Sequence, residues 1–239
     1  MTETVYKILA CALMLPGLVA CDEGRIYDDA VAEQRAGTPA RLDAVLSGYE
    51  SWPNGYTLAL AGFRDGNEYA VISKNVKPGD GGRVEVVLEG VPEETSTVEL
   101  CVVDRLRRRV SSFISVPFER GDTVRLEGTS VDVSPERAIQ NDIFTTTCAQ
   151  CHGGVGHGGS GHSAAGLDLT EGHSFAQLIG VPSVKDEGRL RVRPGDASES
   201  VLYRILSTGE SATWHYDHSV EVTAQEKLLL IKDWIDNYE

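Results

Sequence analysis

The chain is poor in methionine, in positive charge and in long apolar runs. Its two methionines are Met1 and Met14, and its 22 Lys and Arg residues are outnumbered by 36 Asp and Glu. The formal charge of -14 has the wrong sign for binding nucleic acid. The apolar run at residues 8–20 is too short to span a bilayer as a helix. We therefore expect neither a nucleic-acid partner nor a membrane-spanning helix.

That apolar run follows Lys7 and has the position of an export signal. It ends in Leu-Val-Ala-Cys at residues 18–21, which resembles the bacterial lipobox. We expect residues 1–20 to be a lipoprotein signal peptide and Cys21 to carry the lipid. The chain would then be an exported lipoprotein, anchored by Cys21 to a periplasm-facing or cell-surface membrane. The alternative is an ordinary signal peptide followed by a free cysteine. Either kind of cleavage removes both methionines.

Residues 21–40 are polar and predict a tether. From residue 41 to residue 133 the apolar period is two, as in Val84, Val86 and Leu88, and Gly- and Pro-rich turns separate the apolar runs. About seven short strands of this kind predict an all-β, antiparallel sandwich of immunoglobulin or fibronectin type. This region contains no histidine.

At Ser134-Pro135-Glu136 the pattern changes to that of a helix start. Ile139, Ile143 and Phe144 then fall on one helical face. Capping patterns at residues 196–199 and 223–226 predict two further helices. We therefore expect residues 134–239 to form a second, all-α domain.

Cys148-Ala149-Gln150-Cys151-His152 is the pattern of covalent haem attachment, in which two thiols bond the porphyrin and the histidine reaches the iron. A thioredoxin-like pair would need a strand before it, whereas this pair follows a predicted helix. A zinc site could combine Cys148 and Cys151 with two of the nearby histidines, His152, His157 and His162. The intervening glycine-rich loop is unlike a stiff zinc knuckle. The motif favours haem.

Four landmarks in order resemble the cytochrome c domain of secreted planctomycete and Bacteroidetes proteins. They are the motif itself, Gly-Leu-Asp-Leu at 166–169, Arg-Pro-Gly-Asp-Ala-Ser-Glu-Ser-Val-Leu-Tyr-Arg at 193–204 and Leu-Leu-Ile-Lys-Asp-Trp-Ile-Asp at 229–236. The resemblance implies an all-α cytochrome c fold over residues 134–239, with haem c on Cys148 and Cys151 and its iron on His152.

The chain departs from that family at the sixth iron ligand, which is usually a methionine between the third and fourth landmarks. No methionine lies there. His215 stands where the family's methionine commonly falls, seven residues before Val222, and His218 is the runner-up because loop lengths vary. Two imidazole ligands would place the iron's potential below that of a His/Met haem.

We therefore expect a membrane-anchored monohaem c-type cytochrome that passes single electrons between redox protein partners. Two alternatives stay open. One is peroxidase- or oxygen-type chemistry at an open iron site, which the missing methionine would allow. The other is a surface-binding or sensor lipoprotein in which haem only stabilises the fold.

Overall fold

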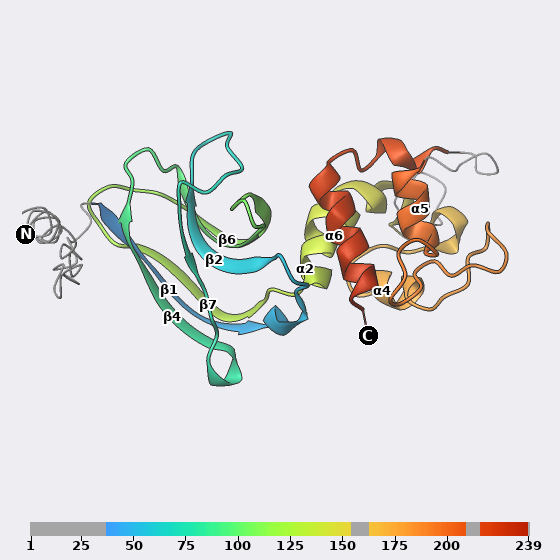
Figure 1. The fold of residues 1–239 in the computed structure, drawn as a ribbon, viewed down its shortest axis with the longest axis horizontal. Helices are drawn as coiled ribbons and strands as arrows, with labels where there is room; N and C mark the ends of the chain where they lie inside the picture. The colour runs from blue at the N-terminus through green and yellow to red at the C-terminus, as the bar shows by residue number, and fades with distance from the viewer. Residues whose placement is uncertain (1–36, 154–162, 209–215, 239) are drawn as a thin grey trace, which may run out of the picture. The chain divides into compact units, whose positions relative to one another are not determined.

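A computed structural model of the chain describes residues 37–153, 163–208 and 216–238. Within these residues, seven strands form two sheets with the strand orders β4-β1-β7 and β3-β2-β5-β6 (Figure 1). The strands are β1 (Thr38–Ser47), β2 (Thr57–Phe63), β3 (Ile72–Asn75), β4 (Arg83–Val91), β5 (Thr97–Val103), β6 (Arg109–Pro117) and β7 (Val124–Asp132). β1 begins inside the segment expected to be a tether.

Side chains from both sheets share one apolar core. Leu42 of β1, Leu60 of β2, Leu100 of β5 and Leu126 of β7 are all at most 1% exposed. The expectation of a purely antiparallel sandwich is wrong at one pair, because β1 and β7 run parallel. The two strands are the first and last of the sheet region, and a connection that long can return in either direction.

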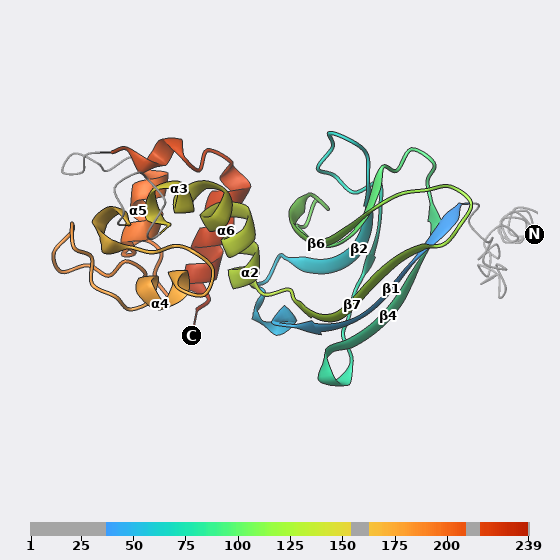
Figure 2. The ribbon, with the colours of Figure 1, turned by 180° about the vertical axis from the view of Figure 1, so that it is seen from behind.

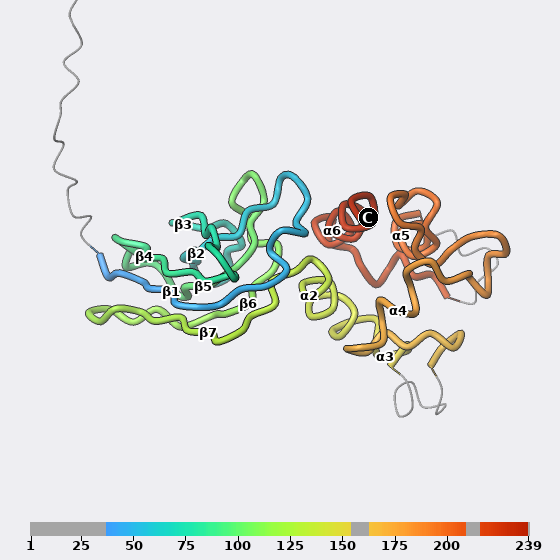
Figure 3. Tube along the Cα trace, turned by 90° about the horizontal axis from the view of Figure 1, so that it is seen from below, coloured from blue at the N-terminus to red at the C-terminus, as the bar shows by residue number. Residues whose placement is uncertain are grey.

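The rest of the chain begins with a helical run in three parts, which are α2 (Pro135–Ile139), the π-helix η3 (Gln140–Cys148) and α3 (Ala149–His152) (Figure 3). The later helices are α4 (Ser174–Leu178), α5 (Val201–Ser207) and α6 (Gln225–Asp236). Single 3-10 turns lie at η1 (Tyr49–Ser51), η2 (Asp80–Gly82), η4 (Ala164–Gly166) and η5 (His218–Val220). None of the helices in the described ranges is long and apolar enough to cross a bilayer.

The expectation of an all-α cytochrome c domain over residues 134–239 is wrong. The helices are short, and the segment between α4 and α5 has no helix. Isolated bridges from Ile179 to Val192, from Pro182 to Leu190 and from Leu190 to Ser200 hold that segment instead. The capping pattern at Asp196 closes a turn, with Asp196 Oδ1 accepting from Glu199 N at 3.1 Å, and the helix starts only at Val201.

The predicted apolar faces are nevertheless confirmed. Ile139, Ile143 and Phe144 are at most 1% exposed, and α6 buries Leu228, Ile231, Trp234 and Ile235. The indole of Trp234 also donates to Glu136 Oε1 at 2.9 Å and so ties α6 to α2. Figure 2 shows these two helices side by side. Ser134 caps α2 as predicted, because its Oγ accepts from Arg137 N at 3.1 Å.

The helical region has its own apolar core, which includes Phe144 and Ile231, and side chains of the sheet region also pack on it. Trp52 and Tyr56 contact both apolar clusters, and the Tyr56 hydroxyl donates to Asp233 Oδ2 at 2.9 Å. Burial is the main reason, ahead of this bond, that the pKa of Tyr56 is raised. All described residues belong to one compact unit, and the division into two domains near residue 133 stays a prediction.

Tyr56→Phe is expected to lower the free energy of unfolding by about 1 kcal/mol, because it removes one half-buried hydrogen bond and leaves the Asp233 carboxylate without that donor. Urea unfolding followed by fluorescence measures the change. Tyr69→Phe is the matched control, since Tyr69 is 48% exposed. Equal unfolding midpoints for the two variants would contradict the assignment.

Candidate functional site

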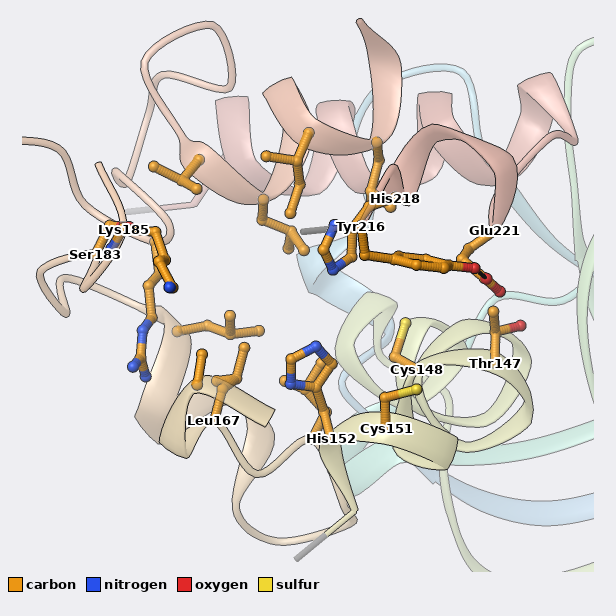
Figure 4. A pocket seen from close by; sticks show the side chains of 18 of the residues that line it. Thr147, Cys148, Cys151, His152, Leu167, Ser183, Lys185, Tyr216, His218 and Glu221 are labelled. Carbon is orange, nitrogen blue, oxygen red and sulfur yellow. Dashed lines mark hydrogen bonds between the residues drawn. The ribbon is translucent and has the colours of Figure 1, made fainter. Parts of the chain in front are cut away.

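The Cys-x-x-Cys-His segment lies at the end of the helical run that starts at Pro135. Cys148 is the last residue of η3, while Cys151 and His152 belong to α3. Side chains three residues apart share one side of a helix. Figure 4 shows the two sulfur atoms on the same side of this run, with the His152 ring beside them (Figure 4). Neither thiol is in a disulfide.

The His152 ring is held through one of its nitrogens. Nδ1 lies 3.0 Å from the carbonyl oxygen of Ala164, and the His152 carbonyl accepts from Leu169 N at 2.6 Å. With Nδ1 donating its hydrogen to Ala164, Nε2 keeps its lone pair for a metal. Burial lowers the pKa of His152, which favours the neutral imidazole.

His218 lies across the cavity from His152. The two ring centroids are 6.2 Å apart with an interplanar angle of 29°. Figure 4 shows a nitrogen of each ring turned toward the other ring. The turn η5 positions His218: Asp217 caps it by accepting from Ser219 N at 2.9 Å, and the Tyr216 ring packs edge-on at 5.3 Å from the His218 ring.

A cavity that is partly open to solvent surrounds this pair. Its walls are mainly apolar, and the residues that line it come from several segments between Thr147 and Glu221. They include Leu169, Leu178, Val201, Leu202 and Leu206, each of which is at most 7% exposed.

Charges are separated within the cavity. Lys185 and Arg191 line it, and Figure 4 shows Lys185 and Ser183 at the end away from Cys148 and Cys151. Glu221 lies at the thiol end and accepts a hydrogen bond from the Tyr216 hydroxyl. Burial, followed by the Glu221 charge, raises the pKa of Cys148 to about 12.

The structure brings together Cys148, Cys151, His152 and the runner-up His218, which all line one cavity. The preferred sixth ligand, His215, lies outside the described residues, as do His157, His162 and Cys21. Sequence reasoning missed Tyr216, Lys185 and Arg191. These residues reach the cavity from loops, and neither their spacing nor their neighbours indicated that position.

The structure bears on the thioredoxin-like alternative for the cysteine pair, whereas the zinc alternative also needs His157 or His162, which lie outside the described residues. A helix, not a strand, leads into the pair. The raised pKa of Cys148 is the opposite of what a reactive, thioredoxin-like thiol needs. Within residues 37–153, 163–208 and 216–238, no group of three His, Cys, Asp or Glu side chains is arranged to hold a metal ion by itself.

No protein-family model matches this chain, and a search of curated proteins also finds no match. The resemblance based on the four landmarks therefore stays a prediction, and the site rests on its own geometry.

In the chain prepared without haem, we expect an alkylating reagent to modify Cys151 first, then Cys148, and Cys101 only on unfolding. Cys151 is exposed, Cys148 is partly buried with a raised pKa, and Cys101 is fully buried. Peptide mapping by mass spectrometry after timed labelling gives the order. Faster labelling of Cys148 than of Cys151 would show that the cavity is built differently.

Proposed function

We propose that the chain is a membrane-anchored, monohaem c-type electron carrier whose haem is bonded to Cys148 and Cys151. His152 and His218 would be the axial ligands of the iron. The observation that carries the proposal is the convergence of both thiols and both imidazoles on one apolar cavity. The lipid on Cys21, the export of the chain and its redox protein partners are parts of the same proposal.

The spacing of the two rings fits a single iron between them. An imidazole nitrogen binds a first-row metal at about 2 Å, so two rings on one ion have centroids about 6 Å apart once about 1 Å from each nitrogen to its ring centre is added. The centroids of His152 and His218 are 6.2 Å apart. The bond from Nδ1 of His152 to Ala164 also leaves the correct nitrogen for the metal.

The two thiols fit covalent attachment without any added oxidant. Each S–H adds across one vinyl C=C of the porphyrin, forming an S–C and a C–H bond, with no leaving group. This chemistry needs both thiols reduced and side by side, as they are here. The bound haem supplies a one-electron Fe(III)/Fe(II) couple.

Ligation of both faces of the iron favours electron transfer over the two alternatives. Peroxidase or oxygen chemistry needs an open position at the iron, and with iron on His152 the His218 ring, 6.2 Å away between centroids, would compete for that position. Two imidazoles also hold the potential below that of a His/Met haem.

The first test is covalent attachment in the full chain, exported from a host with a cytochrome c maturation system. We expect haem staining on a denaturing gel, and loss of the stain when Cys148 and Cys151 are both changed to Ser. Cys101→Ser is the matched control and should keep the stain, because Cys101 lies buried in the sheet region. Complete extraction of haem by acid acetone would overturn the proposal.

The second test concerns the sixth ligand. His218→Ala is expected to keep the attached haem but to convert its low-spin visible spectrum to a high-spin one. His218→Met is expected to raise the potential, by on the order of 0.1 V within the about 0.8 V that axial ligands span.

His173→Ala is the control for these spectra, since the His173 side chain is 63% exposed and is not part of the cavity lining. His215→Ala is measured beside it. If the spin change follows His215, the predicted first choice is the ligand and His218 is not. If neither variant changes the spectrum, the iron has an open position and oxygen or peroxide chemistry becomes the better explanation.

A further inference from the structure

The lining of the cavity includes two cationic side chains. They are Lys185 and Arg191, and both come from the bridged segment between α4 and α5. Figure 4 shows Lys185 beside Ser183, across the cavity from Cys148 and Cys151. Lys185 is exposed and Arg191 is half-buried, so both can donate charge-assisted hydrogen bonds to an anionic group that enters the cavity.

Among the described residues, no carboxylate lies within salt-bridge distance of Lys185 or Arg191. Their neighbour Arg189 differs: it pairs with Asp186 at 3.2 Å and with Glu199 at 3.5 Å. Acidic side chains are therefore available in this segment and are used by the arginine that does not line the cavity.

Arg191 is held in place by its backbone. Its amide donates to the Val181 carbonyl at 2.7 Å, and its carbonyl accepts from Leu202 N at 2.9 Å. One side-chain nitrogen, Nη1, donates to the Gln177 carbonyl at 2.9 Å. A guanidinium has five N–H donors, so most of its donors remain for an anion.

Lys185 is positioned by a turn. The Ser183 hydroxyl accepts from the backbone amides of Lys185, at 3.3 Å, and of Asp186, at 3.1 Å. The turn fixes the start of a long side chain at the rim of the cavity. Lys185 thus stands opposite the two thiols, and the backbone bond from Arg191 to Val181 brings Arg191 to the same segment.

We propose that Lys185 and Arg191 bind the two carboxylate groups that haem carries on the edge opposite its vinyl groups. This inference rests on the proposed function, and it adds the orientation of the haem and a control on its potential. With the vinyl edge bonded to Cys148 and Cys151, the carboxylate edge would lie toward Lys185 and the segment that carries Arg191. Each charge-assisted hydrogen bond then also brings a positive charge near the iron.

The first test measures midpoint potentials of the haem-loaded full chain. Lys185→Met and Arg191→Met are expected to lower the potential, because loss of a nearby positive charge favours Fe(III), and the double variant is expected to lower it further. Arg193→Met and Lys232→Met are the matched controls. They remove the same charge from residues of this region that do not line the cavity, and their potentials should stay at the wild-type value. Potentials that fall equally in variants and controls would overturn the inference.

The second test does not need covalent loading. The full chain with Cys148 and Cys151 changed to Ala is titrated with haem and with haem dimethyl ester, whose carboxylates are blocked. We expect the ester to bind about tenfold more weakly or worse, the equivalent of losing one charged hydrogen bond. Adding Lys185→Met and Arg191→Met should abolish that difference.

The two tests separate the two proposals. If the wild-type chain carries no covalent haem and the Ala variant binds neither porphyrin, the proposed function fails. If haem is attached but the acid and the ester bind equally, the haem site stands and the assignment of Lys185 and Arg191 is wrong.

Discussion

The hydrogen bond between His152 Nδ1 and the Ala164 carbonyl is the interaction on which the site depends. It fixes the ring plane and decides that Nε2, not Nδ1, faces the cavity. The His152 carbonyl is held as well, by the amide of Leu169 at 2.6 Å. Both partners belong to the segment that follows the motif, so the end of the helical run and the wall of the cavity are fixed together.

Much of the cavity wall is not helical, and hydrogen bonds between backbone groups of the loops order it instead. The segment from Ile179 to Ser200 would be poorly ordered as free coil, since fixing each backbone residue costs about 1–2 kcal/mol of entropy. Its bridges to Val192 and Leu190, and the bonds of Arg191 to both Val181 and Leu202, supply the missing order. Val192 is fully buried beneath them and anchors the segment to the core formed by Phe144 and Ile231.

Local sequence patterns predicted the parts of this structure that local physics controls. Ser134 and Pro135 mark a helix start because capping and the fixed φ of proline act within one turn. The helical spacing of apolar residues around Ile143 predicts the buried face of η3, and the same spacing around Ile231 predicts that of α6. The motif likewise indicated Cys148, Cys151 and His152. The all-α expectation failed where the capping pattern at Asp196 closed a turn, since Ser200 Oγ bonds the Asp196 carbonyl at 2.8 Å and ends that turn before the helix.

The remaining parts of the site depend on contacts between distant segments, which no local pattern reveals. His218 reaches His152 only because residues 216–221 fold into a turn that Asp217 caps and that the Tyr216–Glu221 bond closes. The prediction that His215 is the sixth ligand is not tested by this geometry, because His215 lies outside the described residues. Lys185 and Arg191 were missed because isolated bridges, not a helical or strand period, place them at the cavity.

The charge distribution links the thiol chemistry to the proposed electron carrier. The Glu221 charge and burial keep the Cys148 thiol protonated, since they raise its pKa to about 12, and a protonated thiol exchanges poorly with disulfides. A pair of this kind is unsuited to reversible thiol redox chemistry but can form thioether bonds, which are permanent. If the proposed haem uses the thiols in this way, oxidation and reduction would take place at its iron. An iron held between two imidazoles would change its charge without changing its ligands, which would keep the reorganisation on electron transfer small.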